Sequence, residues 1–312
     1  MIMDTIIKTV GISHIYSAGT PFEQIGISGV DFEAQRGEYV GVIGHTGSGK
    51  STFIQHLNGL LKPDTGKIYI GGTDIHSSKT ETLRARYRVG LVFQFPEYQL
   101  FEETVYKDIS FGPRNMKLTA EEIDERVHEA ARFVGLPEDM LQKSPFDLSG
   151  GYRRRAAIAG VIAMRPEVLI LDEPTAGLDP HGRDELMDNI DTYQKARNAT
   201  ILVVTHSMEQ VAERADRVVV FEYGKIAMSG TPKEVFRHSG RLHEMGLSIP
   251  KAAILADKLR ALGVPLDEDI YTTDEIRDAI IMLRFAKHYE NRDTSPNASP
   301  NASQGGGDDN AS

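Results

Sequence analysis

The amino-acid sequence predicts an α/β fold, because apolar runs of strand length alternate with segments that carry helix signals. Nearly continuous apolar runs are typical of parallel strands that are buried on both faces. Five runs fit this description: YVGVIG (39–44), RVGLVF (88–93), EVLILD (167–172), ATILVVT (199–205) and DRVVVFE (216–222). Thr119 and Glu122 form a capping-box pair before one helical segment. Asp179 followed by Pro180 marks the start of another helix, which extends through Lys195.

Two further parts are expected around this parallel core. The first ~40 residues, together with GKIYIGG (66–72), have the pattern of strands in an antiparallel layer. The stretch from about 105 to 165 has a mostly helical pattern. We therefore expect one domain over residues 1–236, in which the helical stretch forms a subdomain.

The C-terminal part of the chain predicts a separate unit and a tail. Residues 237–290 contain two amphipathic helical patterns, PKAAILADKLRALGV and TTDEIRDAIIMLRFAKHYE. Residues 291–312 read NRDTSPNASPNASQGGGDDNAS, a composition that cannot bury enough apolar surface to order the backbone. We expect a small, mostly helical extension followed by a disordered tail.

Composition and charge exclude several classes of function. The formal net charge of −10 argues against a general nucleic-acid binder, and the three arginines at 153–155 are expected to be ion-paired or solvated instead. The chain has no cysteine, which excludes disulfides and thiolate metal sites. The start, MIMDTIIKTVGISHIY, is too polar for a signal peptide, and AAIAGVIAM is shorter than the ~20 apolar residues of a spanning helix. We expect a chain that does not cross a membrane and could sit on one through a partner.

GHTGSGKS (44–51) matches the P-loop pattern G-x-x-x-x-G-K-[ST], with an apolar strand before it and STFIQHLNGL as a helix after it. Its glycines let backbone N–H groups turn toward phosphates, and the helix N-terminus adds its positive end. Lys50 is expected to reach the β- and γ-phosphates and Ser51 to bind Mg²⁺. A chance glycine-rich turn is the alternative, which the flanking elements disfavour. The expected nucleotide-binding residues of this loop are Gly44, His45, Thr46, Gly47, Ser48, Gly49, Lys50, Ser51 and Thr52.

Polar residues follow three of the predicted strands. Asp172 is expected to hold Mg²⁺ and Glu173 to polarise the attacking water, although acidic residues at strand ends are often only solvated. His206 could contact the γ-phosphate or orient the water, and Gln94 could touch the metal or the water. The carboxyl ends of parallel strands meet at the ligand site of such a sheet. We expect Glu173, His206, Gln94 and Lys50 to be catalytic, and Ser51, Gln94 and Asp172 to bind the metal.

DLSGGYRRRAAIAG (147–160) predicts a second anion-binding turn, because a serine and two glycines stand at a helix start. The chain already has one phosphate loop. A partner subunit would explain why one chain has two phosphate-binding turns. This turn would close over a nucleotide that another subunit holds, in a two-fold or pseudo-two-fold sandwich.

Taken in order, the P-loop, Gln94, LSGGY, LILDEP, AGLD (176–179) and His206 resemble the motifs of the ATP-binding-cassette (ABC) ATPases. The resemblance covers residues 1 to about 235. It implies a P-loop NTPase (RecA-like) core with an antiparallel β subdomain, an α-helical subdomain and a small C-terminal extension. It also implies that Tyr16, upstream of the P-loop strand, stacks on adenine.

The same resemblance assigns roles in a dimer. Ser149, Gly150 and Gly151 would cap the γ-phosphate of the partner's ATP, and Asp179 would communicate across the dimer interface. One residue departs from the family pattern: Tyr152 stands where these ATPases usually have glutamine. The serine and the backbone N–H groups of the turn remain, so the cap is expected to survive.

FQFPEYQLFEETVYKDISFGPRNMKL (93–118) resembles the corresponding segment of ATPases from energy-coupling-factor (ECF) importers, and RRRAAIAGVIAMRPEVLILDEPTAGLDPHGR resembles the second of their two ATPase subunits. The implied partners are a second ABC ATPase in a heterodimer, a transmembrane coupling subunit and, indirectly, a substrate-binding membrane subunit. The implied location is the cytoplasmic face of the membrane, and the C-terminal extension would help to hold the two ATPases together. The expected contact residues, for which intramolecular packing is the alternative, are Phe95, Pro96, Tyr98, Leu100 and Phe101.

These expectations amount to an ATPase that uses ATP and Mg²⁺ to drive the import of vitamins or other micronutrients, with a separate membrane protein choosing the substrate. A homodimeric ATPase of a cobalt or nickel importer stays open, since both phosphate motifs are complete. A soluble cassette ATPase that acts on DNA or ribosomes is the rival from another class. Its DNA-repair members carry a long coiled coil between P-loop and signature, whereas about a hundred residues separate Lys50 from Ser149 here.

Overall fold

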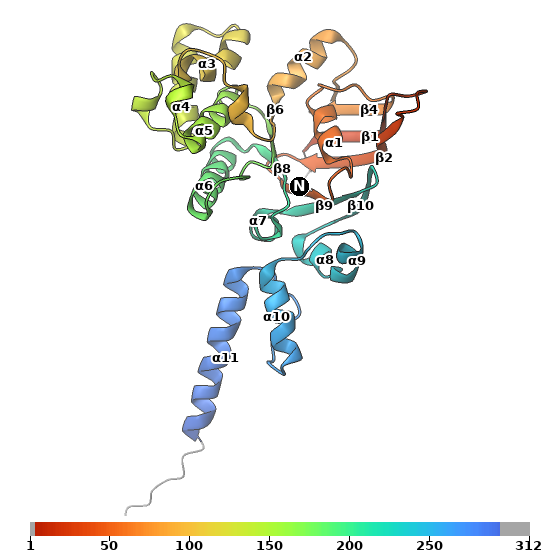
Figure 1. Ribbon diagram of the computed structural model, residues 1–312, viewed down its shortest axis with the longest axis vertical. Coiled ribbons are helices and arrows are strands. Elements are labelled where there is room, and N and C mark those ends of the chain that lie inside the picture. Colours follow the sequence, from red (N-terminus) through yellow and green to blue (C-terminus); the bar gives the residue numbers. More distant parts are fainter. Residues whose placement is uncertain (1–3, 294–312) are drawn as a thin grey trace, which may run out of the picture. The chain divides into compact units, whose positions relative to one another are not determined.

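The computed structural model describes residues 4–293, with side chains described up to Arg284. Within this range the main sheet has six strands in the order β10-β9-β3-β8-β7-β6, and only β10 runs antiparallel to its neighbour (Figure 1). The strands are β3 (Tyr39–Gly44), β6 (Val89–Val92), β7 (Val168–Asp172), β8 (Thr200–Val204), β9 (Arg217–Glu222) and β10 (Lys225–Gly230). Every residue of β3, β6, β7 and β8 is buried. The predicted α/β class is confirmed, and all five apolar runs form strands.

A second, antiparallel sheet packs over the face of the main sheet that also carries the helix after the P-loop. Within the described residues it has the order β2-β1-β4-β5. Its strands are β1 (Thr5–Tyr16), β2 (Gln24–Gln35), β4 (Thr65–Ile70) and β5 (Thr73–Asp74). One buried cluster joins this sheet, helix α1 (Lys50–Leu57) and the main sheet. In that cluster the Phe53 ring lies 5.3 Å from the ring of Phe32 and 5.1 Å from that of Phe221, so the helix after the P-loop is anchored to both sheets.

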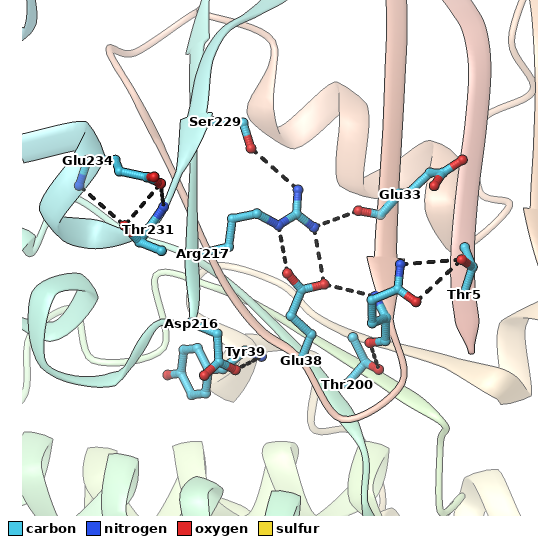
Figure 2. A network of polar contacts seen from close by, with 11 residues as sticks. Thr5, Glu33, Glu38, Tyr39, Thr200, Asp216, Arg217, Ser229, Thr231 and Glu234 are labelled. Atoms are coloured by element: carbon cyan, nitrogen blue, oxygen red, sulfur yellow. Dashed lines mark hydrogen bonds and ion pairs between the residues drawn. The ribbon is translucent and has the colours of Figure 1, made fainter. Parts of the chain in front are cut away.

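Figure 2 shows the polar contacts that join the two sheets near the start of β3 and the start of β9. The Arg217 guanidinium, at the start of β9, donates to Glu38 Oε1 at 2.6 Å and to the backbone oxygen of Glu33 in β2 at 2.6 Å. Glu38 Oε2 accepts from the backbone N–H of Gln35 at 2.8 Å. The Arg217 guanidinium also lies 5.3 Å from the centre of the Phe32 ring. These contacts fix β2 against the starts of β3 and β9.

The helical part packs against the main sheet around a second buried cluster, which includes Leu169 and Leu171 of β7 and Ile201 and Val203 of β8. The helices between α1 and β9 are α2 (Lys79–Arg88), α3 (Val105–Asn115), α4 (Ala120–Phe133), α5 (Gly150–Ile162), α6 (Pro180–Arg197) and α7 (Met208–Arg214). The 3₁₀ turns between them are η1 (Pro96–Gln99), η2 (Glu138–Met140) and η3 (Pro145–Asp147). The predicted capping box before α4 is present: Thr119 and Glu122 exchange backbone-to-side-chain hydrogen bonds of 2.9 and 3.3 Å. Asp179 caps α6 by accepting from the Gly182 N–H at 2.9 Å.

The chain divides into two compact units, one up to Lys251 and one from Ala252. The first ends with α8 (Pro232–Phe236) and α9 (Ser239–Glu244), and the second contains most of α10 (Lys251–Ala261) and all of α11 (Thr273–Asp293). Apolar residues of the second unit form a small core of Ala252, Ala256, Leu266, Ile270 and Ile276. Residues 291–293 of the predicted tail belong to α11, and residues 294–312 lie outside the described residues. None of the helices that the structure describes has the length and apolarity to cross a membrane.

Candidate functional site

The P-loop connects the end of β3 to the start of α1 in a conformation that only glycine adopts easily. Gly49 has φ 106°, and a Cβ atom there would lie 2.6 Å from the backbone oxygen of Gly26 in β2. The Lys50 ammonium lies across the loop and donates to the backbone oxygens of Gly44 at 2.7 Å and His45 at 3.0 Å. Burial lowers the pKa of Lys50, while the charges of Asp172 and Glu173 oppose this shift.

A cavity of about 140 Å³ extends from the P-loop to Tyr16. Tyr16 ends β1, its hydroxyl lies 3.2 Å from Thr52 Oγ1, and its ring packs edge-on against His14 at 4.6 Å between ring centres. The lining is made of Tyr16, residues 24–26 and residues 47–52. The sequence analysis missed Gln24 and Ile25, which reach this cavity because they pair with Tyr16 and Ile15 in the β1–β2 ladder. The cavity therefore joins a phosphate loop to an exposed aromatic ring.

The acidic residues lie beside the P-loop, at the carboxyl end of β7. Asp172 Oδ2 lies 3.5 Å from Ser51 Oγ. Burial raises the pKa of Asp172, and the charge of Lys50 acts against it. A hydroxyl oxygen and a carboxylate oxygen are ligands of the kind that Mg²⁺ prefers, and these two lie close enough to share one ion.

Glu173 has the most perturbed environment of this group. Its backbone is left-handed, with φ 49°, a strained conformation for a residue with a side chain. Burial, followed by the nearby charge of Asp172, raises its pKa to about 7. Its Oε1 is buried without a hydrogen-bond partner among the described residues. Such a carboxyl group can gain or lose a proton near neutral pH, as a general base requires.

His206 follows β8 at the same edge of the sheet. Its Nε2 lies 3.5 Å from Glu173 Oε1. Burial, together with the charge of Lys50, lowers the pKa of His206 below its ordinary value of 6.5, so the imidazole is neutral at pH 7. The structure therefore brings together five predicted site residues: Lys50, Ser51, Asp172, Glu173 and His206.

Among the residues predicted to be catalytic or to bind the metal, Gln94 is the one that does not contact this group. It follows β6 at the same edge of the sheet and is exposed. Within residues 4–293 no hydrogen bond joins its side chain to Ser51, Asp172 or Glu173, so its catalytic and metal-binding roles stay predictions.

The LSGGY turn opens α5 away from the P-loop cavity. Ser149 is the N-cap, and its Oγ accepts from the Tyr152 N–H at 3.5 Å. Nothing lies within 4 Å of the Cβ positions of Gly150 and Gly151, so the turn is open to a ligand. It borders a cavity of about 330 Å³ that also involves Asp179 and shares no lining residue with the P-loop cavity. Tyr152 packs against the core of the helical part and also lines this cavity.

Two of the three adjacent arginines are ion-paired, as expected from the sequence. Arg155 binds Glu185 at 2.7 Å, and Arg154 binds Glu97 at 2.8 Å. Arg153 differs, because its Nε is buried without a hydrogen-bond partner among the described residues.

The aromatic segment after Gln94 divides into packing and surface residues. Pro96 is buried, which fits the alternative of intramolecular packing and not a contact surface, and Leu100 is 9% exposed. Phe95, Tyr98 and Phe101 are exposed, with 84% of Tyr98 and 62% of Phe101 accessible. The segment starts with a left-handed residue, since Phe95 has φ 56°.

Leu100 and Phe101 belong to a largely apolar groove of about 550 Å³ between α2, β6, α3 and α5. One buried carboxyl group lies in it. Asp108 Oδ1 accepts from the backbone N–H groups of Phe101 and Glu102, each at 3.2 Å, whereas Oδ2 is buried without a hydrogen-bond partner among the described residues. The apolar lining of the groove includes Leu60, Leu83, Tyr87, Leu91, Phe93, Phe111, Val161 and Met164.

Comparisons with known proteins agree on one family. The sequence profile described as ABC transporter matches residues 27–176. The chain is 52% identical over 286 residues to the energy-coupling factor transporter ATP-binding protein EcfA2 of Caldanaerobacter subterraneus, covering 91% of this chain and 99% of that protein. The EcfA2 protein of Clostridium perfringens is 51% identical, with 89% and 98% covered.

Two solved structures are similar over most of their length. One is cbiO1 from Clostridium perfringens, part of the ABC transporter complex cbiONQ, with a TM-score of 0.68, 41% identity and coverage of 77% of this chain and 94% of that one. The other is the cassette MJ0796, a dimer in a post-hydrolysis state bound to ADP and phosphate, with a TM-score of 0.65, 26% identity and coverage of 72% and 98%.

Proposed function

This chain belongs to the ABC transporter family and, within it, to the energy-coupling factor transporter ATP-binding proteins, and we propose that it powers the import of vitamins or other micronutrients across a membrane. It is an ABC ATPase, and its work would be to bind ATP, to hydrolyse it and to pass the resulting movement to membrane subunits. The observation that carries the proposal is the group at the carboxyl end of the main sheet. There a half-buried glutamate with a pKa of about 7 lies beside the P-loop lysine and a neutral histidine.

The residues around the P-loop fit ATP together with Mg²⁺. The Lys50 ammonium, now bonded to loop carbonyls, would turn to the β- and γ-phosphates. Ser51 Oγ and Asp172 Oδ2 would bind Mg²⁺, and the buried, unpaired Ser48 Oγ offers one more polar atom beside the phosphates. Bound Mg²⁺ neutralises charge on the phosphate oxygens. Tyr16, at the other end of the cavity, would stack on the adenine ring.

Glu173 is the proposed general base. Its unpaired Oε1 would accept the proton of the attacking water, and its raised pKa makes it a stronger base than an ordinary glutamate. The neutral imidazole of His206 would hold Glu173 or a phosphate oxygen through its Nε2, depending on which ring nitrogen carries the proton.

The position of the LSGGY turn supports a dimer of ATPases. Because this turn and the P-loop lie in separate cavities, one chain presents two half-sites. We infer that Ser149, Gly150 and Gly151 cap the ATP of a second ABC ATPase, with Asp179 next to that interface. A distinct second chain, and so a heterodimer, is proposed because the relatives carry the name of the second ECF ATPase. The unit from Ala252 would help to hold the pair together.

The groove around Asp108 is the proposed docking site for a transmembrane coupling subunit. Its apolar lining suits a short helix of a membrane protein, and Asp108 Oδ2 offers an acceptor to one donor on that helix. Phe101, which lines the groove, and the exposed Tyr98 in the same segment would extend the contact. Docking there would place the chain as a peripheral protein on the cytoplasmic face of the membrane, with the substrate-binding subunit reached only through the coupling subunit.

The experiment that tests the proposal is affinity purification of the chain from gently solubilised native membranes, with every co-purifying polypeptide identified. We expect a second cassette ATPase, one integral membrane subunit and small variable membrane proteins. Recovery without any membrane protein would contradict the importer function.

The similarity to cbiO1 favours one second candidate, a homodimeric ATPase of a metal-ion importer. The same purification separates the two, since the homodimer would recover only this ATPase with its membrane subunits.

A further inference from the structure

The buried side chain of Arg154 connects three functional segments that are far apart in the sequence. It projects from the first turns of α5, immediately after the LSGGY turn, and its side chain is 4% exposed. Its Nε and Nη2 donate to Glu97 Oε2 at 3.1 Å and Oε1 at 2.8 Å, so the guanidinium and the carboxylate pair through two parallel bonds. Glu97 belongs to the η1 turn of the aromatic segment, and its side chain is 14% exposed.

The remaining donor of Arg154 reaches the turn that follows the catalytic glutamate. Nη1 donates to the backbone oxygen of Pro174 at 3.4 Å and also to that of Ala176. Ala176 in turn donates its N–H to the backbone oxygen of Glu173 at 3.2 Å. Arg154 therefore holds the turn that keeps Glu173 in its left-handed conformation.

We propose that Arg154 is a positioning residue that couples the docking groove to the catalytic turn, so that contact with the membrane subunit at the aromatic segment sets the rate at which Glu173 works. This inference rests on the proposed function, because it needs a membrane subunit in the groove. A movement of Glu97 would pull the guanidinium, and the guanidinium would pull the carbonyl groups next to Glu173.

Only arginine can make this set of contacts. Its rigid, planar fork offers two parallel N–H groups to the carboxylate and further N–H groups to the two carbonyl oxygens. A lysine ammonium keeps the charge but has three donors at one point and cannot span both segments. The pair is also costly to separate, since each group alone would be a poorly solvated charge. Burial acts to raise the pKa of Glu97, but the hydrogen bonds and the positive charge of Arg154, together with a backbone hydrogen bond and the charge of Arg153, lower it below its ordinary value.

The test uses the complete transporter, reconstituted in lipid vesicles, and the ATPase pair alone. For each, kcat and KM for ATP are measured with the wild-type chain, Arg154→Lys and Glu97→Gln. We expect Glu97→Gln to keep the KM of the ATPase pair within about twofold, because Glu97 lines neither the P-loop cavity nor the cavity of the LSGGY turn. Arg154 borders the cavity of the LSGGY turn, so Arg154→Lys is judged by its kcat with and without the membrane subunits. The increase in kcat that the membrane subunits cause should fall by about fivefold or more in both variants.

Arg165→Lys is the matched control. Arg165 also makes a two-acid ion pair, with Glu125 and Glu129, but contacts neither the aromatic segment nor the catalytic turn in the described structure. This control should keep the full membrane stimulation. Full stimulation in both Arg154→Lys and Glu97→Gln would overturn the inference, as would a loss of stimulation that Arg165→Lys reproduces. If no membrane subunit is found that stimulates ATP hydrolysis by the wild-type chain, the proposed function itself is overturned.

Discussion

Glu173 Oε1 and His206 Nε2 lie 3.5 Å apart, yet the Glu173 oxygen has no hydrogen bond among the described residues. Both groups are displaced from their ordinary protonation by burial, the carboxyl group toward a pKa of about 7 and the imidazole toward the neutral form. The pair is thus poised so that a small change in the surroundings decides where one proton resides. This arrangement leads to three predictions about Glu173, and the groove leads to a fourth.

Glu173→Gln should bind ATP but hydrolyse it about 10²–10⁴ times more slowly, because the amide keeps the shape and cannot accept the proton of water. ATP hydrolysis and nucleotide binding are measured on the same preparation, and size-exclusion chromatography with ATP should show the closed dimer accumulating. Lys50→Ala is the contrasting variant, which should lose ATP binding itself. Normal turnover in Glu173→Gln would remove Glu173 from the role of base.

The rate of hydrolysis should depend on pH through Glu173. The base acts as the carboxylate, whose fraction rises with pH, so kcat/KM for ATP should rise by about tenfold per pH unit below a pKa of about 7 and level off above it. The measurement is kcat/KM between pH 5.5 and about 8.5, because this ratio reports the pKa of the nucleotide-free enzyme. The residual activity of Glu173→Gln should lack this slope, and a wild-type profile that is flat across pH 7 would contradict the assignment.

Stability should respond to the same group in the opposite sense. The folded-state pKa of about 7 lies above the ordinary value of 4.5, so the folded protein binds the proton more tightly than the unfolded chain. The contribution of Glu173 to stability is therefore full below pH 4.5 and is lost as pH rises through about 7. Glu173→Gln should melt at a higher temperature than the wild type at pH 8 and show little gain at pH 5, in thermal unfolding without nucleotide. An equal gain at both values would mean that the effect is not electrostatic.

The double substitution of Tyr98 and Phe101 by alanine should weaken recovery of the chain with membranes and spare nucleotide binding, since both side chains are exposed and Phe101 lines the groove. Membrane recovery and ATP affinity are compared in parallel. Phe22→Ala, an equally exposed aromatic side chain outside the groove lining, is the control and should be recovered normally. Loss of both properties together would identify Tyr98 and Phe101 as core residues.

The parts of the site that sequence reasoning found are those built from consecutive residues. The P-loop and the LILDEP strand each contain their chemistry in one short stretch, and parallel strands necessarily bring their carboxyl ends to one edge. Lys50, Ser51, Asp172, Glu173 and His206 could therefore be grouped before the structure was known.

The contacts that sequence reasoning missed depend on register and side-chain direction. Gln24 and Ile25 reach the nucleotide cavity only because of how β1 and β2 pair, and this pairing contains several register shifts that no local pattern indicates. Glu97 and Arg154 are 57 positions apart in the sequence, so their ion pair follows from packing alone. The aromatic segment was ambiguous for the same reason: Pro96 faces inward and Tyr98 outward within one 3₁₀ turn.

The strand order of the main sheet has a consequence for hydrogen exchange. Among the described strands β3 has a parallel neighbour on each side, whereas β6 pairs only with β7 and leads directly into Gln94 and the groove. Amide protons of β3 should therefore exchange only on global unfolding, while those at the end of β6 should exchange through small local openings. The chain keeps its nucleotide loop on an inner, slowly exchanging strand of the sheet and attaches its proposed docking segment to an edge strand that opens more easily.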